Sequence, residues 1–141
     1  MAIGFITLIS LISAWVKFST RTQDAAQVFP ATVNRDCAPW DGAAFTVSIP
    51  LNGLVMDISV YQSPDIRSPI TFSFPDQTGR AGRAITILPV GLPEELSGSV
   101  TFQRIEQGSP VEGKFDLVTS TGQQYKGRFI AEWGNEIVYC G

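Results

Sequence analysis

The sequence offers few side chains that could activate a nucleophile. It has 10 Lys and Arg residues and 13 Asp and Glu residues but no histidine, so the commonest general base and metal ligand is absent. A serine or cysteine nucleophile needs a base within hydrogen-bonding reach, and Lys114 and Lys126 are the remaining conventional candidates. Their flanking residues are typical of strands, and we expect both side chains to point into solvent. The sequence therefore predicts no catalytic residue and no enzyme activity.

Paired carboxylates and metal ligands are a second possible source of chemistry. Two carboxylates can hydrolyse glycosidic bonds, and Glu132 could approach Glu136 across a hairpin, as Glu106 could approach Glu112. Such pairs are common on exposed hairpins, which is the interpretation we favour. Segment 76–79 lacks the alternating oxygen ligands of a calcium loop. We expect neither a metal site nor a cofactor.

A short segment rich in glycine and arginine could bind an anion. In Gly79–Arg83 two arginines and two glycines stand within five residues, so guanidinium groups and backbone amides could grip a negative group. The segment lacks the strand-to-helix context of a phosphate loop. A turn with solvated arginines is the simpler interpretation.

Aromatic side chains give a further candidate surface. Five of them could form a carbohydrate-binding face, or the mouth of a barrel that holds an apolar ligand: Trp40, Tyr61, Tyr125, Trp133 and Tyr139. Core packing explains most of them, since Tyr125 and Trp133 share an alternating face with Phe129. Trp40 is the least explained by a core position, because it lies in a turn. The predicted surface for a ligand or partner comprises Trp40, Tyr61, Arg80 and Arg83.

The two cysteines, Cys37 and Cys140, stand near the two ends of the part of the chain that runs from Pro30 to Gly141. An even number of cysteines at domain boundaries indicates a disulfide formed in an oxidising compartment. We expect Cys37 before the first strand and Cys140 in the last, so that the bond joins the first and last strands. The alternative is a pair of free, buried thiols.

Proline and glycine punctuation predicts the elements that must position these residues. All 9 prolines and all but one of the 13 glycines lie from Pro30 onward, and turn signals recur about every 8 to 12 residues, as in sandwiches and barrels. Alternating apolar residues predict strands at 44–49, 54–61, 69–74, 84–88, 99–106, 113–119, 124–133 and 136–140. The last four should form an antiparallel meander, and Leu92–Leu96 is the only candidate helical turn. The predicted fold is all-β, an antiparallel β-sandwich or small β-barrel of about seven to eight strands.

An apolar segment precedes this β-domain. Met1–Val16 contains no charged residue and is followed by Lys17 and Arg21. As a helix, residues 1–18 would span about 27 Å, close to the roughly 30 Å of a bilayer core. We predict a hydrophobic helix in residues 1–22 that is a retained signal-anchor or a cleaved signal peptide, with a buried soluble helix as the third possibility. Residues 23–36 are predicted to be a tether and residues 37–141 the β-domain.

The orientation of this segment is indicated by two conflicting features. Lys17 and Arg21 would keep the following residues in the cytoplasm by the positive-inside rule. The paired cysteines favour export, and we give them more weight because two basic residues are a weak signal. We therefore expect a membrane-anchored domain in the periplasm or at the cell surface, or a secreted one if the segment is cleaved.

Charge and composition narrow the function further. The net charge of −3 argues against a protein that binds nucleic acid through its phosphates. We expect a non-enzymatic domain outside the cytoplasm that contacts the membrane through residues 1–18 and binds a partner protein or small ligand. The alternative is a structural accessory subunit of a membrane complex, since Gly4, Ser10 and Ser13 would permit close helix packing.

Overall fold

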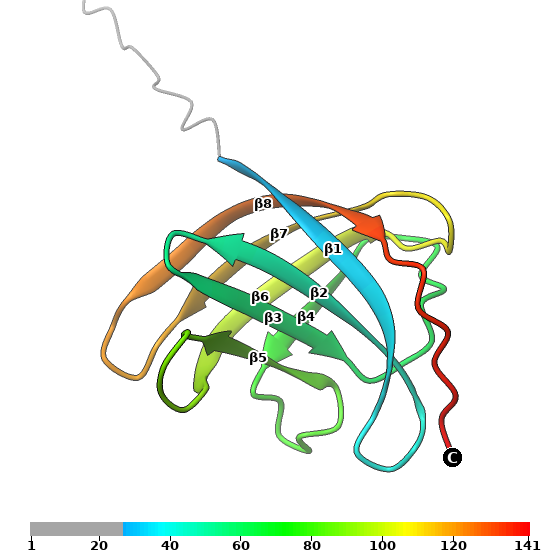
Figure 1. Cartoon of the computed structure of the whole chain (residues 1–141), viewed down its shortest axis with the longest axis horizontal. Helices are drawn as coiled ribbons and strands as arrows, with labels where there is room; N and C mark the ends of the chain where they lie inside the picture. Colours follow the sequence, from blue (N-terminus) through cyan, green and yellow to red (C-terminus); the bar gives the residue numbers. More distant parts are fainter. Residues whose placement is uncertain (1–26) are drawn as a thin grey trace, which may run out of the picture.

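A computed structural model describes residues 27–141 as an all-β domain (Figure 1). The strands are β1 (Val28–Cys37), β2 (Ala43–Leu51), β3 (Leu54–Val60), β4 (Ile70–Phe74), β5 (Gly82–Ile87), β6 (Glu94–Arg104), β7 (Val111–Val118) and β8 (Gln124–Trp133). None of residues 27–141 lies in a helix, so this part of the chain has no helical segment that could cross a membrane. The predicted N-terminal helix in residues 1–22 lies outside the described residues.

Seven of the strands close into a barrel. The order around the ring is β6, β5, β3, β2, β1, β8 and β7, which returns to β6. Neighbours are antiparallel except β1 and β8, which pair in parallel from Val28↔Arg128 to Val33↔Trp133. One parallel contact is unavoidable, because strand directions cannot alternate completely around a ring with an odd number of members. Of the two predicted architectures, the barrel is confirmed.

The extra strand, β4, shares one edge of β6 with β5. β6 pairs first with β5, at Leu96↔Ala84, and then with β4, at Gly98↔Phe74, while its other edge pairs with β7. At this change of partner Gly98 has a φ of 138°, and a Cβ there would overlap the carbonyl oxygen of Asp116. Glycine therefore permits β7 to approach closely. The connection of residues 75–81 leaves the barrel wall here and reaches the candidate surface.

Apolar side chains fill the barrel. Alternate residues of β2, β3, β7 and β8 point inward, and the predicted inward face of Phe45, Val47 and Ile49 is confirmed, since all three are fully buried. Phe102 lies among rings from three other strands, with centroids 5.5 Å from Phe45, 5.9 Å from Phe72 and 5.8 Å from Phe129. Tyr125 and Trp133 are partly buried and pack against the hydrophobic core. The interior of the barrel is thus a hydrophobic core.

Three predicted boundaries differ from the structure. Residues 28–36, predicted as tether, belong to β1, which pairs with β2 on one edge and with β8 on the other although its buried residues do not alternate regularly. Leu92–Leu96 is no helical turn, since Glu94–Leu96 pair with β5. The last predicted strand, 136–140, is also absent: these residues run along the barrel without a strand partner (Figure 1). The C-terminal meander therefore comprises β6, β7 and β8.

The barrel has two ends of different character. At the near end, as we call it, β1 begins, and the β2–β3 turn, the β5–β6 loop and the β7–β8 turn lie on the same side (Figure 1). At the far end lie the β1–β2 loop, the end of β3, the β6–β7 turn and the C-terminal segment. β1 has 10 residues, so its two ends are about 30 Å apart at roughly 3.3 Å per residue.

Candidate functional site

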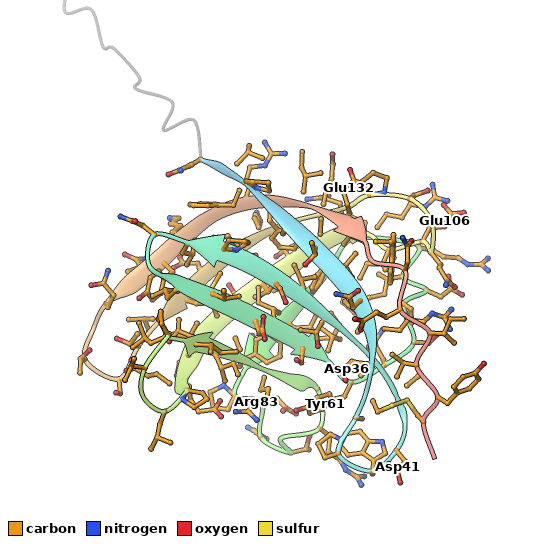
Figure 2. All side chains as sticks on the ribbon, viewed as in Figure 1. Asp36, Asp41, Tyr61, Arg83, Glu106 and Glu132 are labelled. Atoms are coloured by element: carbon orange, nitrogen blue, oxygen red, sulfur yellow. A yellow bond between two sulfur atoms is a disulfide. The ribbon has the colours of Figure 1, made fainter. Side chains whose placement is uncertain are left out.

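The four residues of the predicted surface converge beside the far end of the barrel. Trp40 comes from the β1–β2 loop, Tyr61 follows β3, Arg80 precedes β5 and Arg83 lies in β5. The Trp40 and Tyr61 rings meet edge to face, with centroids 5.4 Å apart and planes at 83°. The Arg80 guanidinium carbon lies 5.1 Å from the centre of the Trp40 ring, in a cation–π contact. We call these four residues the aromatic–arginine site; Figure 2 labels Tyr61 and Arg83 within it.

A tight loop fixes Trp40. The amide of Ala38 donates to the carbonyl of Gly42 at 2.8 Å, and that of Asp41 donates to the carbonyl of Ala38 at 2.9 Å. Asp41 has a φ of 63°, in the left-handed region. A Cβ on Gly42 would lie 2.7 Å from the indole nitrogen of Trp40, so glycine lets the ring lie against the backbone. The Trp40 side chain is held in place, yet the residue is 46% exposed.

A pocket of about 390 Å³ opens beside Tyr61. The amide of Tyr61 donates to the carbonyl of Ala81 at 2.9 Å, which ties the end of β3 to the start of β5. The floor and walls lie where β6 changes partner from β5 to β4, and the lining residues are Tyr61, Phe74, Pro75, Gly79, Gly82, Arg83, Glu95, Leu96 and Ser97. Its size falls within the range of small-ligand pockets, about 300 to 1,000 Å³, and is ample for a protein side chain.

Asp76 organises the loop that presents Arg80. Its carboxylate accepts hydrogen bonds from the Thr78 hydroxyl at 2.5 Å, the Thr78 amide at 3.3 Å and the Ala81 amide at 3.4 Å. The Thr78 hydroxyl accepts from the Arg80 amide at 3.2 Å. The hydrogen bond from the Thr78 side chain is the main reason that the pKa of Asp76 lies below its usual value. These amides already have partners, so the segment 79–83 is not a vacant cradle for an anion.

One of the two arginines of the site is paired with a carboxylate. Arg83 donates to Glu95 at 2.8 Å, and both side chains are largely exposed, so the pair contributes at most about 1 kcal/mol. Arg80 lies against Trp40 and has no salt bridge among the described residues. The site is therefore an aromatic surface with one available guanidinium group beside a pocket. Sequence reasoning missed Glu95, because the residues around it were interpreted as a helical turn.

Tyr61 should lose its proton at a higher pH than a solvated tyrosine. Burial raises its pKa; Arg83 opposes this effect, whereas Glu95 and Asp36 add to it. Because the pKa is raised in the folded state, the resulting stabilisation is complete below the unfolded pKa of about 10 and is lost as the pH rises through the folded value. The measurement is the ultraviolet absorbance of tyrosinate in the native protein minus that of Tyr61→Phe. A difference titration with its midpoint at or below pH 10 would contradict the geometry.

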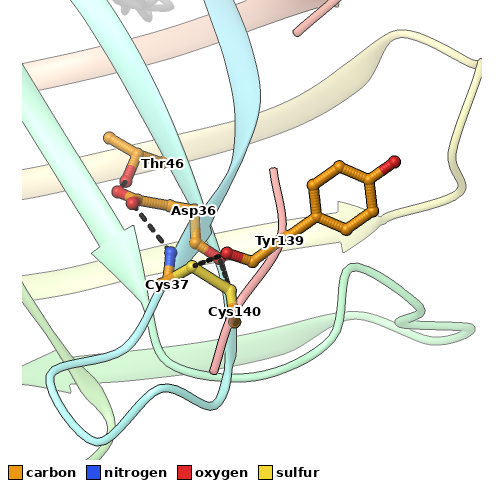
Figure 3. The surroundings of a disulfide bond; sticks show 5 residues. All are labelled: Asp36, Cys37, Thr46, Tyr139 and Cys140. Carbon is orange, nitrogen blue, oxygen red and sulfur yellow. Dashed lines mark hydrogen bonds between the residues drawn. A yellow bond between two sulfur atoms is a disulfide. The ribbon is translucent and has the colours of Figure 1, made fainter. Parts of the chain in front are cut away.

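The predicted cysteine pair forms a disulfide beside the site (Figure 3). Cys37 is the last residue of β1, and Cys140 lies in the C-terminal segment rather than in a strand. Asp36 accepts a hydrogen bond from the Cys37 amide at 2.8 Å through one carboxylate oxygen and from the Thr46 hydroxyl at 2.7 Å through the other. The bond therefore joins the end of β1 to the segment that follows β8.

The other candidates from the sequence remain dispersed. Lys114 and Lys126 lie on exposed positions of β7 and β8, and Lys126 faces Asp116 at 4.0 Å. Glu106 accepts a hydrogen bond from Arg104 at 2.9 Å rather than pairing with Glu112. Glu132 lies near the end of β8 (Figure 2), and Glu136 is exposed in the C-terminal segment. Within residues 27–141 no group of three or more potential metal ligands comes together.

Two more aromatic residues have structural settings. The Trp133 indole donates to the carbonyls of Glu106 at 3.1 Å and Ser109 at 2.8 Å, which fastens the β6–β7 turn. Tyr139 is 90% exposed in the C-terminal segment. The site therefore offers contact surface, one cation and a pocket. No family of proteins, no curated protein and no solved structure was found to match this chain.

Proposed function

We propose that this protein is a non-enzymatic binding domain, held at a membrane outside the cytoplasm, that takes a partner protein at the aromatic–arginine site. The observation that carries the proposal is the convergence of Trp40, Tyr61 and Arg80, from three separate connections of the barrel, with Arg83 of β5. Tryptophan, tyrosine and arginine are the residues most enriched at the energetic centres of protein interfaces. The neighbouring pocket would receive one side chain of the partner.

The rigidity of the site supports this proposal. The loop of Trp40 is closed by two backbone hydrogen bonds, and that of Arg80 is closed by the Asp76 carboxylate. Binding therefore costs little ordering of the site, which favours affinity. The positions of the two lysines considered as bases support the non-enzymatic part of the proposal, because Lys114 and Lys126 are exposed on β7 and β8 and do not line the pocket.

The location is supported by two features. The disulfide between Cys37 and Cys140 is typical of proteins in oxidising compartments. The uncharged sequence of residues 1–16 would provide the attachment to the membrane. β1 runs about 30 Å from its start to the far end, which would hold the binding site away from the bilayer.

Site-specific photocrosslinking in cells that make the protein tests the binding site. A benzophenone amino acid at exposed Gln77, in the loop beside Arg80, should give a discrete adduct, whereas the same group at exposed Gln103 on β6 should not. Adding Trp40→Ala to the Gln77 variant should lower the adduct yield at least about tenfold, as expected for an interface hot spot. Adding Lys114→Ala should leave the yield unchanged.

The same experiment can reject the proposal. Adducts of equal mass and yield from positions 77 and 103 would indicate random encounters. An adduct that survives Trp40→Ala would show that the tryptophan does not contribute to binding. Trp40 lies outside the buried core, so this substitution should leave the fold intact.

A further inference from the structure

The near end of the barrel exposes an apolar rim. Five large hydrophobic residues lie there with exposed fractions from 36% to 88%: Val55, Ile87, Leu88, Val90 and Leu92. A shallow depression of about 420 Å³ separates the β2–β3 turn from the β5–β6 loop, and none of its lining residues is charged. Soluble monomeric proteins rarely expose contiguous apolar patches unless the patch contacts a partner or a membrane.

The loop between β5 and β6 forms the most prominent part of the rim. Residues 88–93 read Leu-Pro-Val-Gly-Leu-Pro and contain no polar side chain. Val90 is 87% exposed and Leu92 is 88% exposed. The two prolines restrict the backbone, so the loop presents these side chains to solvent without collapsing onto the barrel.

Charge is distributed unequally between the two ends. The connections at the near end, residues 52–53, 88–93 and 119–123, contain no Asp, Glu, Lys or Arg. The connections elsewhere carry Asp41, Asp65, Arg67, Asp76, Arg80 and Glu106. Glu94, the first residue of β6, is the charged residue next to these connections and accepts a hydrogen bond from Ser120 of the β7–β8 turn at 3.3 Å. The connections at the near end are thus less charged than those of the rest of the domain.

The position at which β1 begins indicates what kind of surface the apolar rim contacts. Thr32 pairs with Ser48, so Val28 lies level with the β2–β3 turn, at the same end as the rim. The 27 residues before Val28 include the uncharged run of residues 1–16. A membrane attachment through that run would therefore join the domain at its near end.

We infer that the near-end rim rests in the bilayer interface, with Val90 and Leu92 inserted among the lipid acyl chains. The inference rests on the proposed membrane attachment and adds a second contact, which fixes the orientation of the barrel and directs the aromatic–arginine site away from the lipid. The rim has no basic side chain, so the contact depends on apolar burial and needs no anionic lipid.

Quenching by brominated phosphatidylcholine tests this contact in the full chain. The wild-type protein, Leu92→Trp and Tyr139→Trp are reconstituted into vesicles at low protein-to-lipid ratio, and wild-type emission is subtracted to isolate the introduced tryptophan. The two positions are matched, since Leu92 is 88% and Tyr139 90% exposed. Leu92 belongs to the β5–β6 loop and Tyr139 to the C-terminal segment, and these two segments lie at opposite ends of the barrel. For Leu92→Trp we expect the brominated lipid to lower the emission at least about twofold, and the emission to be blue-shifted. For Tyr139→Trp we expect neither quenching nor a blue shift. Added salt should change neither result.

Failure of the inference and failure of the membrane attachment give different results. If the vesicles float in a density gradient with the protein but Leu92→Trp is not quenched, the rim does not touch lipid and the inference alone is overturned. If the wild-type chain does not float with the vesicles, both are overturned. Equal quenching at positions 92 and 139 would also overturn the inference, because the barrel would then have no preferred orientation.

Discussion

Replacing both cysteines, in Cys37→Ala with Cys140→Ala, should lower the free energy of unfolding by about 3 to 4 kcal/mol. The bond joins residues 103 positions apart, for which the chain-entropy model gives about 4.7 kcal/mol. We expect less because residues 135–141 have no strand partner and would gain freedom in the folded protein as well. β1 keeps its pairing with β2 and β8, so the double variant should still fold.

Denaturant titration of the oxidised, reduced and substituted proteins measures this effect. Reduced wild type should match the double variant, because both lack only the crosslink. As a control, Ile137→Ala alters an exposed residue of the same C-terminal segment and should change stability by less than about 0.5 kcal/mol. A double variant within 1 kcal/mol of the oxidised protein would show that the bond does not constrain the unfolded chain.

The state of the cysteines also bears on the proposed location. Free thiols are blocked in intact cells, and disulfides are then reduced. If the domain matures in an oxidising compartment, Cys37 and Cys140 should become reactive only after the reduction. Cysteines that react before reduction would remove the main argument for export. The remaining argument, the apolar run of residues 1–16, is compatible with either face of a membrane.

Alternation along the sequence was sufficient to predict strands that bury one face. Phe45, Val47 and Ile49 in β2 and Phe115 and Leu117 in β7 stand at every second position, and all of them are buried. β1 was missed because Pro30 and the polar run 34–36 interrupt the alternation, although its backbone pairs on both edges. One of its two neighbours, β8, is distant in sequence, and a local pattern cannot reveal that pairing.

The candidate site shows the same division. Trp40, Tyr61, Arg80 and Arg83 were selected by residue type, and their proximity follows from the antiparallel pairing of β3 with β5, which places the end of β3 beside the start of β5. Sequence spacing alone does not contain that information, since β4 intervenes along the chain. Glu95 was overlooked for a related reason: its strand becomes recognisable only through its pairing with β5.

The two proposed contacts use opposite ends of the barrel. The proposed lipid contact uses side chains that no strand pattern needs, such as Val90 and Leu92, and the proposed protein contact uses loops that are closed by their own hydrogen bonds. Neither surface contributes to the buried core. Each can therefore be altered without unfolding the domain, provided that the core between them is stable.

Phe102→Ala tests that condition and should be among the most destabilising single substitutions in the domain, with a loss of about 3 to 5 kcal/mol in the free energy of unfolding. Phe102 is fully buried, and its ring contacts those of Phe45, Phe72 and Phe129. These residues belong to β2, β4 and β8, so the Phe102 side chain connects the seven-stranded barrel with the extra strand β4. Truncation removes three edge-to-face contacts and leaves a cavity that the closed barrel cannot collapse to fill.

Denaturant unfolding followed by tryptophan fluorescence measures the loss, with Phe102→Leu as the matched variant. Leucine fills most of the space, so its cost should be about 1 to 2 kcal/mol, and the difference between the two variants reports the cavity. Because small domains are stable by only about 5 to 15 kcal/mol, Phe102→Ala should leave a marginally folded barrel in which both proposed surfaces lose their geometry together. A loss below about 1 kcal/mol for Phe102→Ala would mean that the three rings do not pack around Phe102, and that β4 is not joined to the barrel core in the way described.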